Sequence, residues 1–172
     1  GLEEHTNNTF FEGIEKLPAS HNLFYNLTDH SFSIQPYYKI EFNTDVNDLN
    51  QDQAIKKYAD EFNRSINLRL RSDVKVGTCL SGGLDSSSVA AIAGQQYSAT
   101  SNQKFIAIHA KSTEKNSDES LLAKQVAVYC KLDLHFVEPT SENFIEAIDE
   151  VIYTQEEPFG GPYVFMQYFV LK

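Results

Sequence analysis

A chain of 172 residues is long enough for one ordinary domain, and its apolar content of 41% allows a buried core. The 14 Lys and Arg residues against 24 Asp and Glu give a formal net charge of −10, with no basic block, which argues against a nucleic-acid partner. No stretch reaches the ~18 apolar residues of a membrane span, and the first residues lack the charged-then-apolar layout of a signal peptide.

The two cysteines, Cys79 in an apolar strand pattern and Cys130 in a helical pattern, are expected to be small core residues. Unpaired core cysteines suit a reducing compartment, so the sequence predicts a cytoplasmic protein. Five histidines share no metal-ligand spacing, and two of them lie in strands that look buried. We interpret them as structural.

Residues 1–43 carry Pro18, Pro36 and short aromatic alternations such as residues 31–34, which predict two or three short strands at the edge of a larger structure. They contain no chemical motif. Residues 50–71 follow, with apolar side chains every three or four positions, which predicts a long amphipathic helix. Its apolar positions are Ile55, Tyr58, Phe62, Ile66 and Leu70.

Residues 74–91 are the most informative segment of the chain. A strand-like stretch to Leu80 leads into Ser-Gly-Gly-Leu-Asp-Ser-Ser, which opens directly into an alanine-rich helical pattern. Gly82 and Gly83 allow the backbone to turn tightly and present its N–H groups to an anion. The first N–H groups of the following helix lack partners and point the same way. The segment therefore predicts a phosphate-binding loop.

Asp85 is the unexpected member of this loop, because a carboxylate repels a phosphate unless a cation lies between them. Mg²⁺, which prefers hard oxygen ligands, is the expected cation. The loop also differs from the Walker pattern, since no lysine follows its glycines.

Strand and helix patterns alternate after the loop, with the spacing of βαβ units. This predicts a doubly wound α/β fold with a parallel sheet and the ligand at the carboxyl ends of the strands. The expected strands are residues 105–110 and 134–137, and the expected helices are residues 118–129, capped by Asn116 or Ser117, and residues 144–152.

Two further segments carry predictions. Glu156 and Glu157 lie in a turn expected at the same end of the sheet as the loop, so they are candidates for chemistry or an exposed charged turn. The apolar helical pattern of residues 163–171 ends without a cap, which favours a segment of a longer protein. We expect this apolar stretch either to fold back on the sheet or to pair between chains as a homodimer.

The order of these pieces resembles the synthetase domain of glutamine-hydrolysing asparagine synthetases. The resemblance covers roughly residues 45–172 and rests on the Ser-Gly-Gly-Leu-Asp-Ser-Ser loop, on Ser117-Asp118-Glu119-Ser120 and on the Glu-Glu-Pro-Phe turn. Residues 11–18 also look like the segment with which that family leaves its glutaminase domain. The resemblance thus divides the chain into residues 1–43, the end of a glutaminase domain, and residues 44–172, the first part of a synthetase domain.

The resemblance implies a fold of the adenine nucleotide α-hydrolase type, truncated at its C-terminus, and a reaction in two steps. ATP adenylates the side-chain carboxylate of aspartate with release of pyrophosphate, and glutamine-derived ammonia then displaces AMP to give asparagine. By the same resemblance Asp85 would hold Mg²⁺ and Glu156 would act at the synthetase centre. The implied pyrophosphate cradle is Ser81, Gly82, Gly83, Leu84 and Ser86, and the implied lining of the nucleotide pocket is Cys79, Leu80 and Ala107.

The departures from the family pattern leave more than one function open. The family's nucleophile for glutamine hydrolysis is an amino-terminal cysteine, which would lie upstream of Gly1, and the family's second metal-binding segment and catalytic lysine would follow Lys172. Relatives of this type also close β-lactam and peptide rings. Further hypotheses are an NAD or GMP synthetase, a tRNA-modifying transferase, and a regulatory domain that binds nucleotide without turnover. The acidic charge argues against the tRNA branch.

Overall fold

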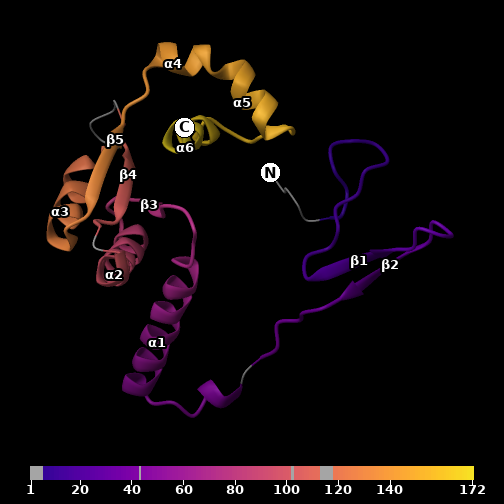
Figure 1. Ribbon diagram of the computed structural model, residues 1–172, viewed down its shortest axis with the longest axis horizontal. Coiled ribbons are helices and arrows are strands. Elements are labelled where there is room, and N and C mark those ends of the chain that lie inside the picture. The colour runs from indigo at the N-terminus through magenta and orange to yellow at the C-terminus, as the bar shows by residue number, and fades with distance from the viewer. Residues whose placement is uncertain (1–5, 43, 102, 113–117) are drawn as a thin grey trace. The chain divides into compact units, whose positions relative to one another are not determined.

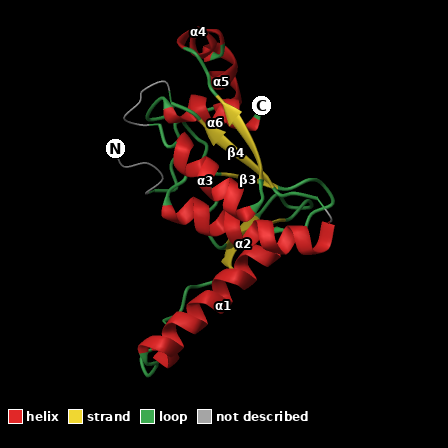
Figure 2. Cartoon of the chain, turned by 90° about the vertical axis from the view of Figure 1, so that its left-hand side faces the viewer, coloured by secondary structure: helices red, strands yellow, loops and turns green. Residues whose placement is uncertain are grey.

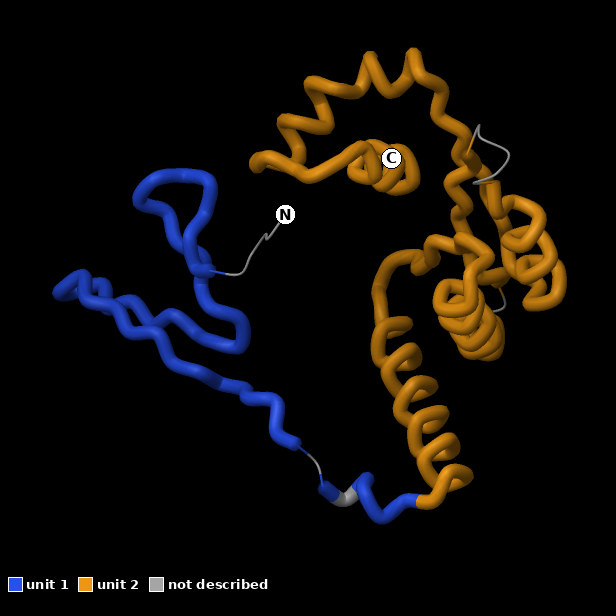
Figure 3. The backbone as a smooth tube through the Cα atoms, turned by 180° about the vertical axis from the view of Figure 1, so that it is seen from behind, with its two compact units in different colours: residues 1–49 blue, residues 50–172 orange. Residues whose placement is uncertain are grey.

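The computed structural model describes residues 6–42, 44–101, 103–112 and 118–172. The chain divides into two compact units, Gly1–Leu49 and Asn50–Lys172, which are coloured separately in Figure 3. The predicted phosphate-binding loop, residues 81–86 and called the phosphate loop below, lies entirely within the second unit.

The first unit is built around an antiparallel hairpin of β1 (His21–Tyr25) and β2 (Phe32–Pro36), in which Tyr25 pairs with Phe32. Two side chains shape its turn, because Asn26 accepts a hydrogen bond from the Thr28 N–H and Asp29 accepts one from the Ser31 N–H. The predicted short strands are confirmed. Most of their side chains are exposed, so backbone pairing and turn geometry hold this hairpin.

The second unit begins with α1 (Gln51–Arg69), which follows a short 3₁₀ turn at Thr44–Val46. Asn50 and Gln53 form a reciprocal capping box, in which each side chain accepts a hydrogen bond from the other residue's backbone N–H. Ile66 is the buried residue of this helix and packs toward α2 (Leu84–Ser101). The helix predicted over residues 50–71 is therefore confirmed, with its apolar stripe only partly covered.

A parallel three-stranded sheet forms the centre of the unit, in the order β3 (Gly77–Cys79), β4 (Ile106–Ala110) and β5 (Asp133–Val137). The crossover helices α2 and α3 (Ser120–Cys130) lie on one side of the strands, because two right-handed connections that step in the same direction place their helices on the same face. Figure 1 shows α3 on one side of β4 and α6 (Tyr163–Leu171) on the other. The predicted α/β fold with a parallel sheet is confirmed.

Two predicted boundaries change. The strand expected over residues 74–80 is shorter, because β4 offers partners only from Ile106 onward and Gly77 is the first residue paired with it. The helix expected from residue 118 begins at Ser120. Asp118 accepts a hydrogen bond from the Ser120 N–H and so forms a turn before the helix, whereas the predicted caps Asn116 and Ser117 lie outside the described residues.

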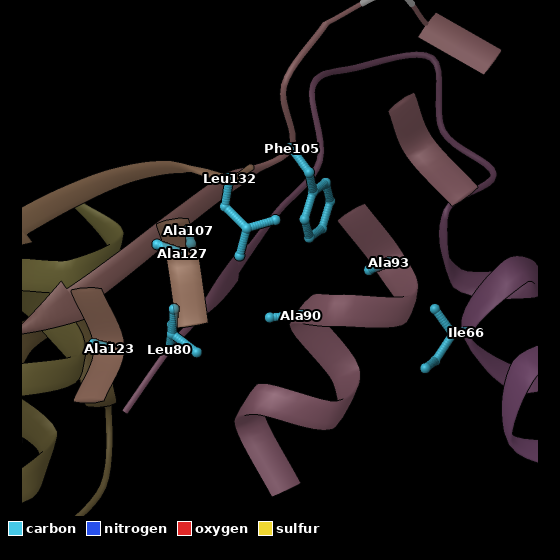
Figure 4. Close-up of a cluster of buried hydrophobic side chains, with 9 residues drawn as sticks. All are labelled: Ile66, Leu80, Ala90, Ala93, Phe105, Ala107, Ala123, Ala127 and Leu132. Carbon is cyan, nitrogen blue, oxygen red and sulfur yellow. The ribbon is translucent and has the colours of Figure 1, made fainter. Parts of the chain in front are cut away.

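Small side chains dominate the core between the sheet and its helices. Figure 4 shows Ile66 on one side of α2 and Leu80, Phe105 and Leu132 on the other. The remaining members are Ala90, Ala93, Ala107, Ala123 and Ala127. Because alanines fill so little volume, the helices approach the sheet closely. A Cβ on Gly94 would lie 2.5 Å from a Leu132 methyl carbon.

The end of the chain forms a second cluster. The helix predicted over residues 144–152 is interrupted at Ala147, which separates α4 (Ser141–Glu146) from α5 (Ile148–Gln155). Ala147, Val151, Val164 and Phe165 are its buried residues. Since α6 also contacts β4, the apolar segment folds back on the sheet, as one of the two expectations had it.

The structure corrects the expectation for the cysteines. Cys79 is exposed and Cys130 is half-buried, so neither is a fully buried core residue. Cys79 alternates with Thr78 and Leu80 along the strand and therefore faces away from α2 and α3. Within the described parts of the chain, no helix is both long and apolar enough to cross a bilayer.

Candidate functional site

The loop between β3 and α2 contains a backbone conformation that requires glycine. Gly82 adopts φ = +93°, a region that glycine reaches without strain. A Cβ at this position would lie 2.7 Å from the Leu122 Cβ and 2.8 Å from the Ala123 backbone nitrogen, both on α3. The first turns of α3 therefore press against the loop, and only a residue without a side chain fits between them.

Hydrogen bonds that involve two serine hydroxyls hold the loop's residues to one another. The Ser81 N–H donates to the Ser86 Oγ at 3.2 Å, and the two serine hydroxyls lie 2.8 Å apart. The Gly83 N–H donates to the Ser81 Oγ at 3.2 Å, while the Ser86 hydroxyl donates to the Gly83 carbonyl at 3.3 Å. These contacts set the loop's shape without a ligand, so the loop is preorganised.

The start of α2 supplies the free donors. The first helical hydrogen bond that reaches back into the loop runs from the Ser87 N–H to the Gly83 carbonyl at 3.0 Å. In the described structure the N–H groups of Leu84, Asp85 and Ser86 have no acceptor. They lie at the partly positive end of a helix of 18 residues. Such an arrangement binds phosphate, sulfate or carboxylate groups.

Asp85 lies in the first turn of α2 with an exposed side chain, and its carboxylate has no partner among the described residues. The same part of the chain contains no group of three or more His, Cys, Asp or Glu that would hold a metal by itself. A single carboxylate beside a phosphate site nevertheless fits Mg²⁺, which keeps several waters and shares its remaining positions with phosphate oxygens. The donor set therefore fits magnesium carried with a phosphate ligand.

The strand ends beside the loop are largely buried. Leu80 is 1% exposed and Ala107 is 0% exposed, and both belong to the core against α2 and α3. Cys79, the third residue predicted to line the pocket, is exposed on the other face. Beyond β3, the Leu80 N–H still donates to the Ile108 carbonyl at 2.9 Å, and the His109 Nδ1 lies 2.7 Å from the Leu80 carbonyl oxygen.

Charged groups follow at the same edge of the sheet. The pKa of Asp118 is held below its ordinary value, chiefly by the hydrogen bonds from the Ser120 hydroxyl and N–H and also by the nearby Lys111 and His109. The pKa of Lys111 is raised, chiefly by its hydrogen bond to Glu138 at 2.6 Å. Both cation and carboxylates are solvent-accessible at this edge.

Glu156 stands apart from the loop. It ends α5 in the left-handed conformation with φ = +58°, its side chain is exposed, and it lines a surface hollow with its neighbours Ile152, Tyr153, Glu157, Pro158 and Phe159. In Figures 1 and 2, α5 lies toward the opposite end of the unit from α1. Among the described residues, no hydrogen bond or ion pair joins Glu156 to the loop, and no loop residue lines this hollow.

The sequence prediction missed the residues that hold the loop from outside. The sequence alone places His109 only among the five histidines interpreted as structural, and Leu122 only within the helix expected over residues 118–129. The register of the strands would have indicated the position of His109, because Cys79 is the last residue of β3 and pairs with Ile108, the residue before His109. The other strand histidine, His135, is 58% exposed beside Asp133.

Comparison with known proteins adds to this geometry. Residues 57–172 match the family model described as asparagine synthase. The chain belongs to the asparagine synthase family. The matched region contains α2, α3 and the whole phosphate loop.

Individual relatives share limited identity with this member of the family. Amidase chyE of Penicillium rubens is 24% identical over 87% of this chain, and the glutamine-hydrolysing asparagine synthetase of Mus musculus is 40% identical over 55% of it. The chain spans 24% and 17% of their respective lengths. Among solved structures, an NH₃-dependent NAD synthetase from Campylobacter jejuni covers 66% of this chain and 45% of its own, with 18% identity and a TM-score of 0.39.

Proposed function

We propose that this chain is the nucleotide-binding part of an ATP-dependent ligase that activates a carboxylate as its adenylate and then converts it to an amide. The observation that carries the proposal is the preorganised loop at residues 81–86, with its free N–H groups, inside the region that matches the asparagine synthase family. Aspartate is the proposed carboxylate and glutamine-derived ammonia the proposed amine. The amide product is then asparagine.

Different residues in and beside the loop are proposed to bind different parts of magnesium-bound ATP. Backbone N–H groups at the start of α2 are proposed to hold the pyrophosphate portion, with the Ser81 and Ser86 hydroxyls beside it. Asp85 is the residue that would hold Mg²⁺, and the cation supplies positive charge that makes pyrophosphate a better leaving group. The side chains of Leu80 and Ala107 are buried against α2 and α3, so any contact of these two residues with the nucleotide is proposed to come from their backbone.

The proposed reaction has two balanced steps. An aspartate carboxylate oxygen attacks the α-phosphorus of ATP, an oxygen–phosphorus bond forms, and the bond to pyrophosphate breaks. Ammonia then attacks the activated carbonyl carbon, loses a proton, and AMP leaves. The loop's fixed donors stabilise charge that develops on the departing pyrophosphate, the kind of contact whose loss costs a rate factor of ~10² or more. Glu156 is proposed, from the family resemblance, to act at the synthetase centre, where the carboxylate is adenylated and then amidated.

Direct binding tests the proposal on the 172-residue chain. Calorimetric titration with magnesium pyrophosphate should show binding, and Ser86→Ala should weaken it about tenfold or more, because the Ser81 N–H loses its acceptor and the loop loses the hydrogen bonds that hold its shape. Ser88→Ala is the matched control, since its hydroxyl donates to the Leu84 carbonyl within α2 at 2.8 Å. Absence of binding by the unaltered chain would contradict the proposal.

The reaction is tested separately on the full-length gene product. Incorporation of labelled pyrophosphate into ATP should require aspartate, because the exchange reports reversible adenylation. Exchange that depends on another carboxylate would keep the ligase and replace the substrate. Binding without exchange on any carboxylate would favour a regulatory nucleotide-binding domain.

A further inference from the structure

We propose that His109 is a positioning residue for the phosphate loop, acting through the peptide unit that joins Leu80 to Ser81. This inference rests on the proposed function, because it assigns a role in holding the loop that binds pyrophosphate. His109 belongs to β4 and is 3% exposed, whereas Leu80, whose carbonyl it contacts just before the loop, lies 29 residues earlier in the chain.

The hydrogen bond fixes the tautomer of the ring. A carbonyl oxygen only accepts, so the His109 Nδ1 carries the proton and donates to the Leu80 oxygen at 2.7 Å. The Nε2 atom is buried and has no hydrogen-bond partner among the described residues. The ring also packs edge-on against Phe136, with ring centroids 5.6 Å apart. Packing and one hydrogen bond together define a single orientation of the imidazole.

The same peptide unit is held at both of its ends. Its carbonyl oxygen belongs to Leu80 and accepts from His109, while its N–H belongs to Ser81 and donates to the Ser86 Oγ at 3.2 Å. Since the peptide is planar, fixing the oxygen fixes the direction of the N–H. Ser86 in turn contacts the Ser81 hydroxyl, which accepts from the Gly83 N–H. The buried hydrogen bond from His109 therefore orients the Leu80–Ser81 peptide plane, and this orientation directs the Ser81 N–H toward Ser86.

Leu80 is 1% exposed. Removing the imidazole donor would therefore leave its carbonyl buried without this hydrogen-bond partner. An unpaired buried carbonyl favours rotation of its peptide toward another donor. That rotation turns the Ser81 N–H away from Ser86 and loosens the loop before any ligand arrives. The expected consequence is weaker binding of pyrophosphate from a chain that is still folded.

Two substitutions at His109 separate donation from packing. Asn presents an amide N–H close to the position of Nδ1, whereas Leu fills similar space and donates nothing. We expect His109→Leu to weaken magnesium pyrophosphate binding about tenfold, the loss of one buried hydrogen bond of about 1.4 kcal/mol, and His109→Asn to stay within about threefold of the unaltered chain. Phe136→Leu removes the ring contact but keeps the imidazole donor, so it should lower the melting temperature and weaken binding less than His109→Leu does.

The outcomes are distinct. If the unaltered chain does not bind magnesium pyrophosphate, the proposed function and this inference both fail. If it binds and His109→Leu binds equally well, or if His109→Asn is as weak as His109→Leu, only the inference fails. Should the Leu variant not fold, ¹⁵N NMR of the unaltered chain decides, because a protonated Nδ1 whose resonance shifts on addition of pyrophosphate supports the role, and an unprotonated or unresponsive Nδ1 overturns it.

Discussion

The phosphate loop and the turn at Glu156 are the two places where the sequence predicted chemistry, and they are held in opposite ways. The loop is braced by hydrogen bonds among its own serines, by contact of Gly82 with α3 and by a side chain from β4. Glu156 lies on an exposed turn, where its backbone N–H donates to the Ile152 carbonyl and so ends α5. The first site is held by contacts from three segments of the chain, whereas the second is held by one backbone hydrogen bond at the end of a helix.

Gly82→Ala should have the largest effect, because the new Cβ would push the loop away from α3. The substitution combines a strained positive φ with a 2.7 Å contact to Leu122, and each of these costs about 1–3 kcal/mol. We expect pyrophosphate binding to disappear and the free energy of unfolding to fall by about 2–6 kcal/mol, measured by calorimetry and urea titration.

Gly161→Ala is the control for that experiment, since a Cβ there would lie 3.4 Å from the Tyr163 ring and meet ordinary packing. Native-like affinity in Gly82→Ala would show that the loop is not braced as described.

Asp85→Asn should come next, with a loss of affinity and little loss of stability. The side chain is exposed and unpartnered in the described structure, so the melting temperature should change little. Affinity for pyrophosphate in the presence of Mg²⁺ should fall about a hundredfold if the charge holds the cation, the scale of one strong electrostatic contact.

Metal removal completes the comparison. Chelation of Mg²⁺ should reduce binding by the unaltered chain to the level of the Asp85→Asn variant and leave that variant unchanged. A chelator effect of equal size in both proteins would remove Asp85 from the metal site.

Glu156 and Lys131 offer a matched pair for the exposed turn. Both end a helix in the left-handed conformation, with φ = +58° and +56°. Replacing either by Gly should raise the free energy of unfolding by about 0.5–1 kcal/mol, because glycine adopts this conformation without strain.

Only the Glu156 substitution should affect the reaction. We expect Glu156→Gly to lower aspartate-dependent pyrophosphate exchange in the full-length gene product by about tenfold or more, with magnesium pyrophosphate binding unchanged. Equal exchange in the two glycine variants would assign Glu156 a structural role.

The smallest effect concerns Asp118 at the start of α3, which lies behind the loop. Its pKa is lowered in the folded chain, so its contribution to stability is complete above about pH 4 and is lost as the pH falls through the folded-state value. Asp118→Asn should therefore flatten the acid side of a plot of melting temperature against pH. Asp73→Asn, at an exposed residue with no side-chain partner in the described structure, should keep the slope of the unaltered chain.

The sequence predicted the fold and the loop because both depend on local patterns. The strand-to-helix context of Ser81–Ser86 and the period of α1 and β4 are written in adjacent residues, and the structure has them where expected. The exposure of Cys79 was missed because it depends on which face of the sheet the helices cover. The contacts of His109 and Leu122 with the loop were missed for a related reason, since they join segments far apart in the chain and require strand order and register.

The alanine-lined packing of α2 has a consequence for how the sequence can vary. Ala90, Ala93 and Gly94 face the core, and the helix begins only four residues after Leu80 leaves the strand ladder. Each residue inserted or deleted in the loop would rotate α2 by about 100° about its axis. The small side chains would then leave the core and larger ones would take their place. The length of the loop is thus set by the interior of the protein as well as by its ligand, and we expect insertions and deletions there to be tolerated far less than substitutions.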